Sequence, residues 1–392
     1  MSLPALSGAE ATVRSMRLLH TSDWHIGRTF HGRDLLADQR EVLSGLADLV
    51  AAEGIDVVLI AGDLYDRAVP STEAVRVCTE VLGAIRAAGA QIVLISGNHD
   101  SAPRLAAFAE FAAAGGLHVR ARIAGLDEPV LLTDEHGQVA IYGLPYLEPD
   151  IAREPLGTER GHAAVLGAAM DRVRADLAGR DARSVVLAHA FVTGGQGSES
   201  ERKIAVGGVE DVPGSTFDGV DYVALGHLHG RQVLAEHLRY SGSPLAYSFS
   251  EINHHKSAFI VELDATGLAE VRTHELPVPR RLATLSGELD DLLADPAHDT
   301  LVDCYLSVVL TDRARPLDAM RKLQARFPYA AHVEWRPEGG LPQHQRYAQR
   351  VKNRTDTELT ANFVTDCRNS PPTEAEQALL DEALREVAEV AK

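Results

Sequence analysis

Residues 55–66 read Ile-Asp-Val-Val-Leu-Ile-Ala-Gly-Asp-Leu-Tyr-Asp, a nearly unbroken apolar run that ends in a glycine and two carboxylates. Such a run is typical of a strand that is buried on both faces, as in a parallel sheet covered by helices. Apolar residues recur at helical spacing before it, at 34–53, and after it, at 71–88, and a second buried strand is predicted at 92–95. This alternation predicts a layered α/β domain.

Polar clusters follow predicted strands along the whole domain. They are Asp23-Trp24-His25 after a strand at 17–21, Gly62-Asp63 with Asp66 after 55–60, Gly97-Asn98-His99-Asp100 after 92–95, His189 after 184–188, and Gly226-His227-Leu228-His229 after 222–225. Because α/β sheets gather ligand sites at the carboxyl ends of their strands, we expect these clusters to meet. Each cluster alone is compatible with a turn or a structural histidine, whereas five in this order are not.

The residue types in these clusters suit metal ions. Carboxylates and imidazoles are ligands for divalent manganese, iron or zinc, and the clusters contain no thiolate. A carboxylate can bridge two ions, and an asparagine oxygen can complete a second coordination sphere. Glycines beside Asp63, Asn98 and His227 permit close backbone approach. The sequence therefore predicts a centre of two divalent metal ions.

Composition limits the class of protein. The chain has 392 residues, of which 45% are hydrophobic and 24% charged, as expected for a soluble globular protein of two or three domains. The net charge of −18, taken alone, argues against a nucleic-acid binder. Three widely spaced cysteines exclude a disulfide framework and indicate a reducing, cytoplasmic compartment. No apolar run reaches the roughly 18 residues of a membrane span.

Composition shifts and prolines predict five segments. They are a disordered lead-in at 1–15, the α/β domain at 16–279, a smaller α/β unit at 280–336, a polar linker at 337–355 and a helical tail at 356–392. Within these segments, helices are predicted at 104–114, 162–177, 286–294, 316–327, 356–368 and 373–390, and strands of the smaller unit at 301–310 and 330–335.

The five clusters together resemble the calcineurin-like metallophosphoesterase superfamily. Further stretches, at 20–27, 61–67, 198–202, 206–208 and 217–229, resemble the SbcD family of nuclease subunits, which process DNA double-strand breaks. The resemblance extends over nearly the whole chain from Arg17. It implies a layered β-sandwich flanked by helices, a small α/β capping domain and a C-terminal helical tail.

The resemblance also implies roles for single residues. The metal ligands would be Asp23, His25 and His229 for a first ion, Asn98, His189 and His227 for a second, and Asp63 as the bridge. His99 would act near the leaving group as a proton donor or transition-state stabiliser, and Asp100 would orient His99 by a hydrogen bond. The two ions, for which manganese is the first candidate, would activate water to attack a phosphodiester.

Basic residues are expected to hold DNA phosphates. Those on loops next to the clusters are Arg28, His31, Arg33, Arg67, Arg104, Arg202 and Lys203, although any one of them is also compatible with a solvated surface. Residues 313–354 hold 10 basic and 3 acidic residues. Arg321, Lys322 and Arg326, on a helix of this block, either contact DNA or form a solvated helix face.

The tail carries apolar stripes that either pack onto its own domain or dock a partner. The stripe residues include Leu359, Phe363, Leu380 and Leu384. The resemblance implies that the tail binds an SMC-like ATPase of the SbcC type, in a heterotetramer built on a homodimer. Helices 35–53 and 71–88 are candidates for the dimer contact.

The predicted function is that of a manganese-dependent DNA nuclease, acting as exonuclease and as endonuclease on hairpins, in the cytoplasm at the nucleoid. Two alternatives from other classes stay open. One is a stand-alone phosphodiesterase for small substrates, which would need no tail. The other is a catalytically idle scaffold for the ATPase, against which the intact ligand set argues.

Overall fold

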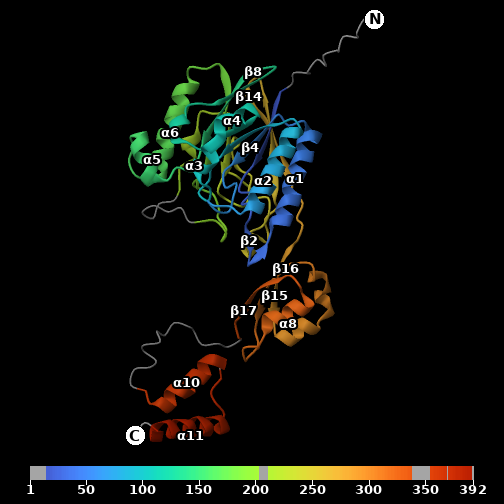
Figure 1. Ribbon diagram of the computed structural model, residues 1–392, viewed down its shortest axis with the longest axis vertical. Coiled ribbons are helices and arrows are strands. Elements are labelled where there is room, and N and C mark those ends of the chain that lie inside the picture. The colour runs from blue at the N-terminus through green and yellow to red at the C-terminus, as the bar shows by residue number, and fades with distance from the viewer. Residues whose placement is uncertain (1–14, 203–210, 338–353, 369, 391–392) are drawn as a thin grey trace. The chain divides into compact units, whose positions relative to one another are not determined.

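The computed structural model describes residues 15–202, 211–337, 354–368 and 370–390. The chain divides into two compact units, Met1–Pro279 and Arg280–Lys392, and each is described by itself (Figure 1). The predicted lead-in therefore lies outside the described residues except for Ser15, as does most of the predicted linker. Among the described helices, none combines the length and the apolar character needed to cross a bilayer.

Two six-stranded sheets form the larger unit. The first has the order β14 (Gly267–Glu275), β13 (Ser257–Asp264), β1 (Met16–Thr21), β4 (Val57–Ala61), β5 (Gln91–Ile95) and β6 (Leu117–Arg120). The second has the order β11 (Gln232–Val233), β12 (Leu238–Tyr240), β10 (Tyr222–Gly226), β9 (Ala182–His189), β8 (Gly137–Leu144) and β7 (Val130–Asp134). A small hairpin joins β2 (Thr29–Phe30) to β3 (Arg33–Asp34).

The two sheets pack face to face around one apolar core. The core takes Leu18, Leu59 and Val93 from the first sheet. Ile141 and Val185 are among those it takes from the second. All five residues of β4 are buried, as the apolar run at 55–60 predicts for a strand covered on both faces.

Helices cover the outer faces of this sandwich (Figure 1). They are α1 (Leu36–Glu53) and α2 (Thr72–Ala87) on the side of the first sheet, and α5 (Pro149–Leu156) and α6 (His162–Leu177) on the side of the second. The hydroxyl of Ser71 caps α2 by accepting the N–H of Ala74 at 3.1 Å. Gly54, at φ 61°, ends α1 in the left-handed conformation. This architecture confirms the predicted fold class.

One predicted helix of the larger unit is broken. The segment 104–114 consists of α3 (Ala102–Leu105), a 3₁₀ turn at Ala106–Phe108 and α4 (Ala109–Ala114). The break follows from Phe108, whose backbone (φ −125°, ψ 24°) leaves the helical region. Further 3₁₀ turns lie at Ile123–Gly125, Gly214–Phe217 and Phe249–Glu251.

The second unit contains a three-stranded parallel sheet with its own core. Its elements are β15 (Leu282–Gly287), α7 (Leu289–Ala294), β16 (Tyr305–Leu310), α8 (Ala319–Arg326) and β17 (Ala330–Trp335). Leu306, Leu323 and Phe327 are fully buried within it. The strand predicted at 301–310 starts later, because Pro296–Leu301 forms a 3₁₀ helix, and the helix predicted from 286 starts after β15.

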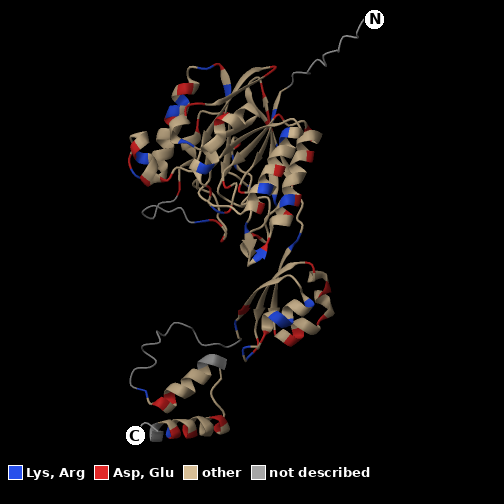
Figure 2. Ribbon diagram, viewed as in Figure 1, with Lys and Arg blue, Asp and Glu red and all other residues tan. Residues whose placement is uncertain are grey.

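Two helices end the described chain, α10 (Asp356–Arg368) and α11 (Glu374–Val390), and they contact each other. Thr373 and Glu376 form a capping box at the start of α11: the backbone N–H of Thr373 donates to the Glu376 carboxylate at 2.7 Å, and the hydroxyl oxygen of Thr373 accepts the backbone N–H of Glu376 at 3.4 Å. Among the charged residues of α11, acidic ones predominate (Figure 2).

Candidate metal centre

The fold explains why the polar clusters meet. Strands β1, β4 and β5 are parallel neighbours in one sheet, and β9 and β10 are parallel neighbours in the other. Their carboxyl ends therefore lie along one edge of the sandwich, where both sheets contribute side chains. This edge brings together all seven residues that the sequence analysis expects to bind metal: Asp23, His25, Asp63, Asn98, His189, His227 and His229.

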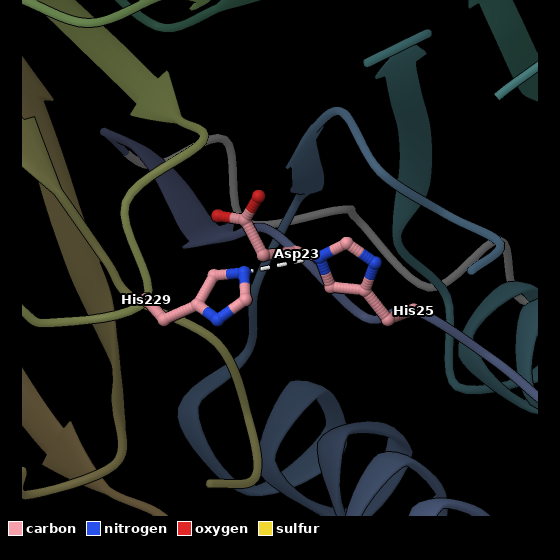
Figure 3. Close-up of side chains that lie close together, drawn as sticks. All are labelled: Asp23, His25 and His229. Atoms are coloured by element: carbon pink, nitrogen blue, oxygen red, sulfur yellow. Dashed lines mark hydrogen bonds between the residues drawn. The ribbon is translucent and has the colours of Figure 1, made fainter. Parts of the chain in front are cut away.

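Three of these residues form a group that we call the His229 group: Asp23, His25 and His229. All three are buried, and one candidate ligand atom from each lies within 4.8 Å of the others. The Nε2 atoms of His25 and His229 face each other at 3.1 Å (Figure 3). Nδ1 of His25 is buried without a hydrogen bond. Two imidazole nitrogens that converge beside a buried carboxylate make an arrangement that a divalent cation fits.

Three of the remaining four form the His189 group: Asn98, His189 and His227. Nε2 of His189 lies 2.9 Å from Oδ1 of Asn98, and Nδ1 of His227 lies 3.3 Å from the same oxygen. Nδ1 of His189 lies 2.9 Å from the carbonyl oxygen of Ala61, an atom that can only accept. Nδ1 therefore carries a hydrogen, and Nε2, which is directed into the site, is the nitrogen that a metal would bind after losing its own proton.

The carboxylate of Asp63 contacts both groups. Its Oδ2 lies 3.5 Å from Nε2 of His25 and 3.5 Å from Nε2 of His189. Its Oδ1 accepts the backbone N–H of His99 at 2.8 Å. A buried carboxylate between two sets of nitrogen and oxygen donors has the position needed to bridge two cations.

The backbone is strained at these positions. Among the described residues, six other than glycine have positive φ, and four of them are predicted ligands: Asp23 (54°), His25 (45°), Asp63 (50°) and His227 (104°). Such conformations cost about 1–3 kcal/mol each and persist where the surrounding structure overdetermines them. Their concentration at one edge of the sandwich marks that edge as a functional site.

Two glycines leave space for this packing. A Cβ atom at Gly226 would overlap the carbonyl oxygen of Ala61, and one at Gly97 would overlap Asp63. The clusters thus need glycine beside their ligands, because the loops approach closely, between the two sheets at Gly226 and within the first sheet at Gly97.

Burial and mutual charge shift the protonation of the site. Burial raises the pKa of Asp23 to about 6, although nearby histidines oppose the shift. Burial lowers the pKa of His189, but the carboxylates of Asp63 and Asp23 and the carbonyl oxygen of Ala61 together outweigh burial and raise it to about 9. The same pairing holds the pKa of Asp63 well below its usual range despite burial. Burial lowers the pKa of His227 to about 3 and also lowers that of His25, so both imidazoles are neutral at pH 7.

His99 lies beside the ligands, and Asp100 does not orient it. The ring of His99 packs edge-on against His25 with centroids 4.5 Å apart, and its Nδ1 lies 2.8 Å from the carbonyl oxygen of Asp66. The Asp100 carboxylate instead accepts the N–H groups of Leu64 and Tyr65 at 3.0 Å, and also that of Gly97. Asp100 therefore joins two ligand loops, which corrects its expected role.

The basic residues near the site divide into engaged and exposed ones. Arg28, only 15% exposed, donates to the carbonyl oxygen of Ser200 at 2.7 Å, pairs with Asp66 at 3.4 Å and stacks on Tyr247. It joins two loops, and its role in holding DNA stays a prediction. Arg202 is exposed and points its guanidinium at the carbonyl oxygen of Asn98, 3.4 Å away.

The remaining basic candidates are spread more widely. Arg67 and Arg104 are exposed, His31 is exposed in the β2–β3 turn, Arg33 is half-buried on β3, and Lys203 lies outside the described residues. On α8, Arg321 and Lys322 are exposed. Arg326 is 18% exposed and donates to the carbonyl oxygens of Leu292 and Asp295, so its guanidinium joins parts of the small unit, and its contact with DNA stays a prediction.

Sequence reasoning missed the residues that support the site from behind. Ser200 and Glu251 contact Nδ1 of His229, and Gln39 donates to the backbone oxygens of Trp24 and His25. The stretch 198–202 resembles the nuclease family, which was a signal for Ser200. No local pattern marks Gln39 or Glu251, because their partners lie 14 or more residues away in the chain.

A family model described as calcineurin-like phosphoesterase matches residues 16–231, more than half of the chain, and the match includes all seven converging residues. The chain belongs to this family. Membership makes it a metal-dependent phosphoester hydrolase, and the buried His/Asp groups are where divalent metals would bind. A second model, SbcD_C, described as the type 5 capsule protein repressor C-terminal domain, matches residues 278–367.

Solved structures with some likeness to this phosphoesterase include GAP50, the anchor in the inner membrane complex of Plasmodium. It is 11% identical, with 84% of this chain and 99% of that chain covered and a TM-score of 0.40. Another is a dimetal phosphatase from Danio rerio, which is 12% identical, with 67% and 99% covered and a TM-score of 0.37.

Proposed function

We propose that this phosphoesterase is the DNA nuclease subunit of a double-strand-break processing complex of the SbcCD type, cleaving phosphodiesters as an exonuclease and, at hairpins, as an endonuclease. The observation that carries the proposal is the succession of two matches on one chain, a phosphoesterase domain at 16–231 and an SbcD_C domain at 278–367. A hydrolase of small phosphodiesters would need only the first.

Two divalent ions are the proposed cofactors, and manganese is the first candidate for both. The His229 group would hold one ion, the His189 group the other, and Asp63 would contact both. Carboxylate, amide and imidazole donors without a thiolate fit manganese. When bound, two such ions supply a nucleophilic water at neutral pH and offset the charge of the phosphate.

His99 is the proposed group for the leaving oxygen. Its Nδ1 faces the carbonyl oxygen of Asp66, so that nitrogen carries a hydrogen and holds the ring in place. Burial lowers the pKa of His99, which makes the imidazole neutral in the free protein. The negative charge of a bound phosphodiester would favour the imidazolium, and this form can donate a proton to the departing sugar oxygen.

DNA binding is proposed for the exposed arginines around this edge. Arg202 lies beside Asn98, and Arg67 and Arg104 follow the loops that carry Asp63 and Asn98. Positive side chains here would contact backbone phosphates even though the whole chain carries a net charge of −18, because the field at the site depends on nearby groups. We propose weak DNA binding by this subunit alone and stronger binding in a complex.

The proposed partner of the tail is an SMC-like ATPase of the SbcC type. Phe363 on α10 and Leu379 and Val387 on α11 are 64%, 66% and 68% exposed. Leu359, Leu380 and Leu384, the other expected contact residues, are half-buried. Exposed apolar side chains on two amphipathic helices suit docking to a second protein, and the small unit at 280–336 is proposed to cap the nuclease domain.

A homodimer of nuclease domains completes the proposal. The apolar residues of α1 and α2, the candidate helices, are mostly buried within their own domain. Phe108 and Phe111, which lie between α3 and the end of α4, are instead 74% and 82% exposed. Two neighbouring exposed phenylalanines favour this segment as the dimer contact.

The decisive experiment is digestion of duplex DNA with free or blocked ends in Mn²⁺, with and without the ATPase and ATP. We expect Mn²⁺-dependent release of nucleotides from free ends. His99→Ala should lose this activity while its metal content stays the same as in the wild type. Deleting residues 356–392 should abolish the complex and keep this activity. Intact DNA together with rapid turnover of bis-p-nitrophenyl phosphate would contradict the proposal and favour the small-substrate phosphodiesterase.

A further inference from the structure

A chain of buried hydrogen bonds leads away from the metal centre behind His229. It consists of Ser200, Glu251 and Lys256, whose exposed fractions are 8%, 1% and 4%. Oγ of Ser200 lies 2.6 Å from Nδ1 of His229 and 2.5 Å from Oε1 of Glu251. Nζ of Lys256 lies 2.5 Å from the other oxygen, Oε2, of Glu251. Three separate stretches of the chain thus converge on one imidazole.

The chemistry of these groups assigns the hydrogens. An ionised carboxylate only accepts, so the single hydroxyl hydrogen of Ser200 goes to Glu251. Oγ of Ser200 must then accept a hydrogen from Nδ1 of His229. The second neighbour of Nδ1, Oε1 of Glu251 at 3.4 Å, is also an acceptor. His229 is therefore the Nδ1–H tautomer, and its lone pair is on Nε2, the atom that faces His25 in Figure 3.

The backbone of His229 is held by the same surroundings. Glu201, next to Ser200, accepts the N–H of His229 at 2.8 Å. Lys256 donates to the carbonyl oxygen of His229 at 3.1 Å and to the hydroxyl of Ser243 at 2.9 Å. Ring and backbone are thus fixed together, and the ring can neither rotate nor change tautomer without breaking a buried hydrogen bond.

We propose that Ser200 and Glu251 are positioning residues that hold His229 as the Nδ1–H tautomer with Nε2 directed at Asp23 and His25. This inference rests on the proposed two-metal centre, and it assigns roles to Ser200 and Glu251, which the proposed function leaves unused. Without Ser200, a cation must select one tautomer and one ring orientation on binding. Groups that orient a metal-binding histidine contribute about 10–100-fold in metal affinity.

The test compares three variants by calorimetric titration of the metal-free, full-length protein with Mn²⁺. Ser200→Ala should weaken one of the two sites by about 10–100-fold and leave the other unchanged. Ser200→Thr keeps a hydroxyl and should keep both affinities. Ser250→Ala is the matched control, because Ser250 is exposed and contacts Glu199 and Ser248 but not His229. Equal weakening of both sites, or none, in Ser200→Ala would overturn the proposal.

A second measurement needs no metal. Long-range ¹⁵N–¹H correlation spectra of the metal-free protein report the tautomer of each histidine, and His229→Gln identifies the signals of His229. We expect an Nδ1–H tautomer in the wild type and a mixture in Ser200→Ala. An Nε2–H tautomer in the wild type overturns the proposal. An Nδ1–H tautomer in a protein that takes up no Mn²⁺ supports the role of Ser200 and contradicts the proposed metal centre instead.

Discussion

The two groups of the metal centre are held in different ways. In the His229 group, Nδ1 of His229, the imidazole nitrogen that points away from the other ligands, is hydrogen-bonded to a side chain, Ser200. Ser200 is in turn hydrogen-bonded to Glu251. In the His189 group, Nδ1 of His189 is hydrogen-bonded to a main-chain carbonyl oxygen, that of Ala61. A side-chain support can be removed by one substitution. A main-chain support can be disturbed only by changing the space around it.

The largest effect is expected where the two groups share a residue. Asp63 lies 3.5 Å from both His25 and His189, so Asp63→Asn should remove the ionised oxygen that serves each group. We expect loss of metal at both positions and a fall in hydrolysis of about 10³-fold, since such ions contribute several kcal/mol to the transition state. Metal content and phosphodiester turnover measure this.

The control for this change is Asp127→Asn, at an exposed aspartate of the same domain. It should keep metal content and turnover. If Asp63→Asn lost metal from one position alone, the two groups would not share this carboxylate.

The next largest effect is expected from a substitution that disturbs the main-chain hydrogen bond of His189. Gly226→Ala places a Cβ against the carbonyl oxygen of Ala61, the acceptor of His189. We expect destabilisation of about 1–3 kcal/mol and weaker binding confined to the His189 group. Thermal unfolding and metal titration measure these changes.

Gly83→Ala is the matched comparison, because a Cβ at this position of α2 meets no atom within 4 Å. It should be neutral or stabilise the helix by up to about 1 kcal/mol. Equal unfolding temperatures for the two alanine variants would show that the loop relaxes around Gly226.

The pH dependence of metal binding should also separate the groups. The carboxylate of Asp63 raises the pKa of His189 to about 9, so this imidazole carries a proton at pH 7. Because a metal binds the neutral form, binding must release that proton, and affinity should rise about tenfold per pH unit up to about pH 9. His25 and His227, whose pKa values are lowered by burial, release none.

Calorimetry in buffers of different ionisation enthalpy counts the released protons. We expect about one proton near pH 7 in the wild type and close to none in His189→Gln. Release that is unchanged in His189→Gln would assign the proton to another residue.

The smallest effects concern the two arginines beside the groups. Arg28 joins loops behind the His229 group. Arg28→Ala should lower the unfolding temperature by a few degrees, because about 1 kcal/mol of hydrogen bonding is lost.

Exposed Arg202 lies beside the His189 group. Arg202→Ala should keep stability, weaken DNA binding and reduce its logarithmic salt slope by about one. If Arg28→Ala weakened DNA binding at unchanged stability and Arg202→Ala destabilised the protein, the roles of the two arginines would be the reverse of those proposed.

Local patterns predicted the parts of the fold that depend on local periodicity. The apolar run at 55–60 became the buried strand β4, and the spacing at 162–177 became α6. They did not predict β6, whose four residues are all half-buried and form no apolar run. They placed a continuous helix at 104–114, where Phe108 interrupts it.

The candidate site follows the same division. Asp63 and His227 could be singled out because metal-ligand residue types follow strands whose ends must meet. The resemblance implied that Asp100 orients His99, whereas its carboxylate accepts the N–H groups of Leu64 and Tyr65. Arg326 was predicted either to contact DNA or to lie on a solvated helix face, and its guanidinium donates to the carbonyl oxygen of Leu292.

From the order of strands and polar clusters alone, the sequence predicts a layered α/β domain with metal-binding residues that converge at one edge, and the resemblance of these clusters to a known family adds the phosphoesterase activity. The reason is that strand period and residue chemistry are local properties. The tertiary structure decides which tautomer His189 and His229 adopt and which arginines stay exposed. These depend on atoms such as the Ala61 carbonyl and the Glu251 carboxylate, which only folding brings within hydrogen-bond distance.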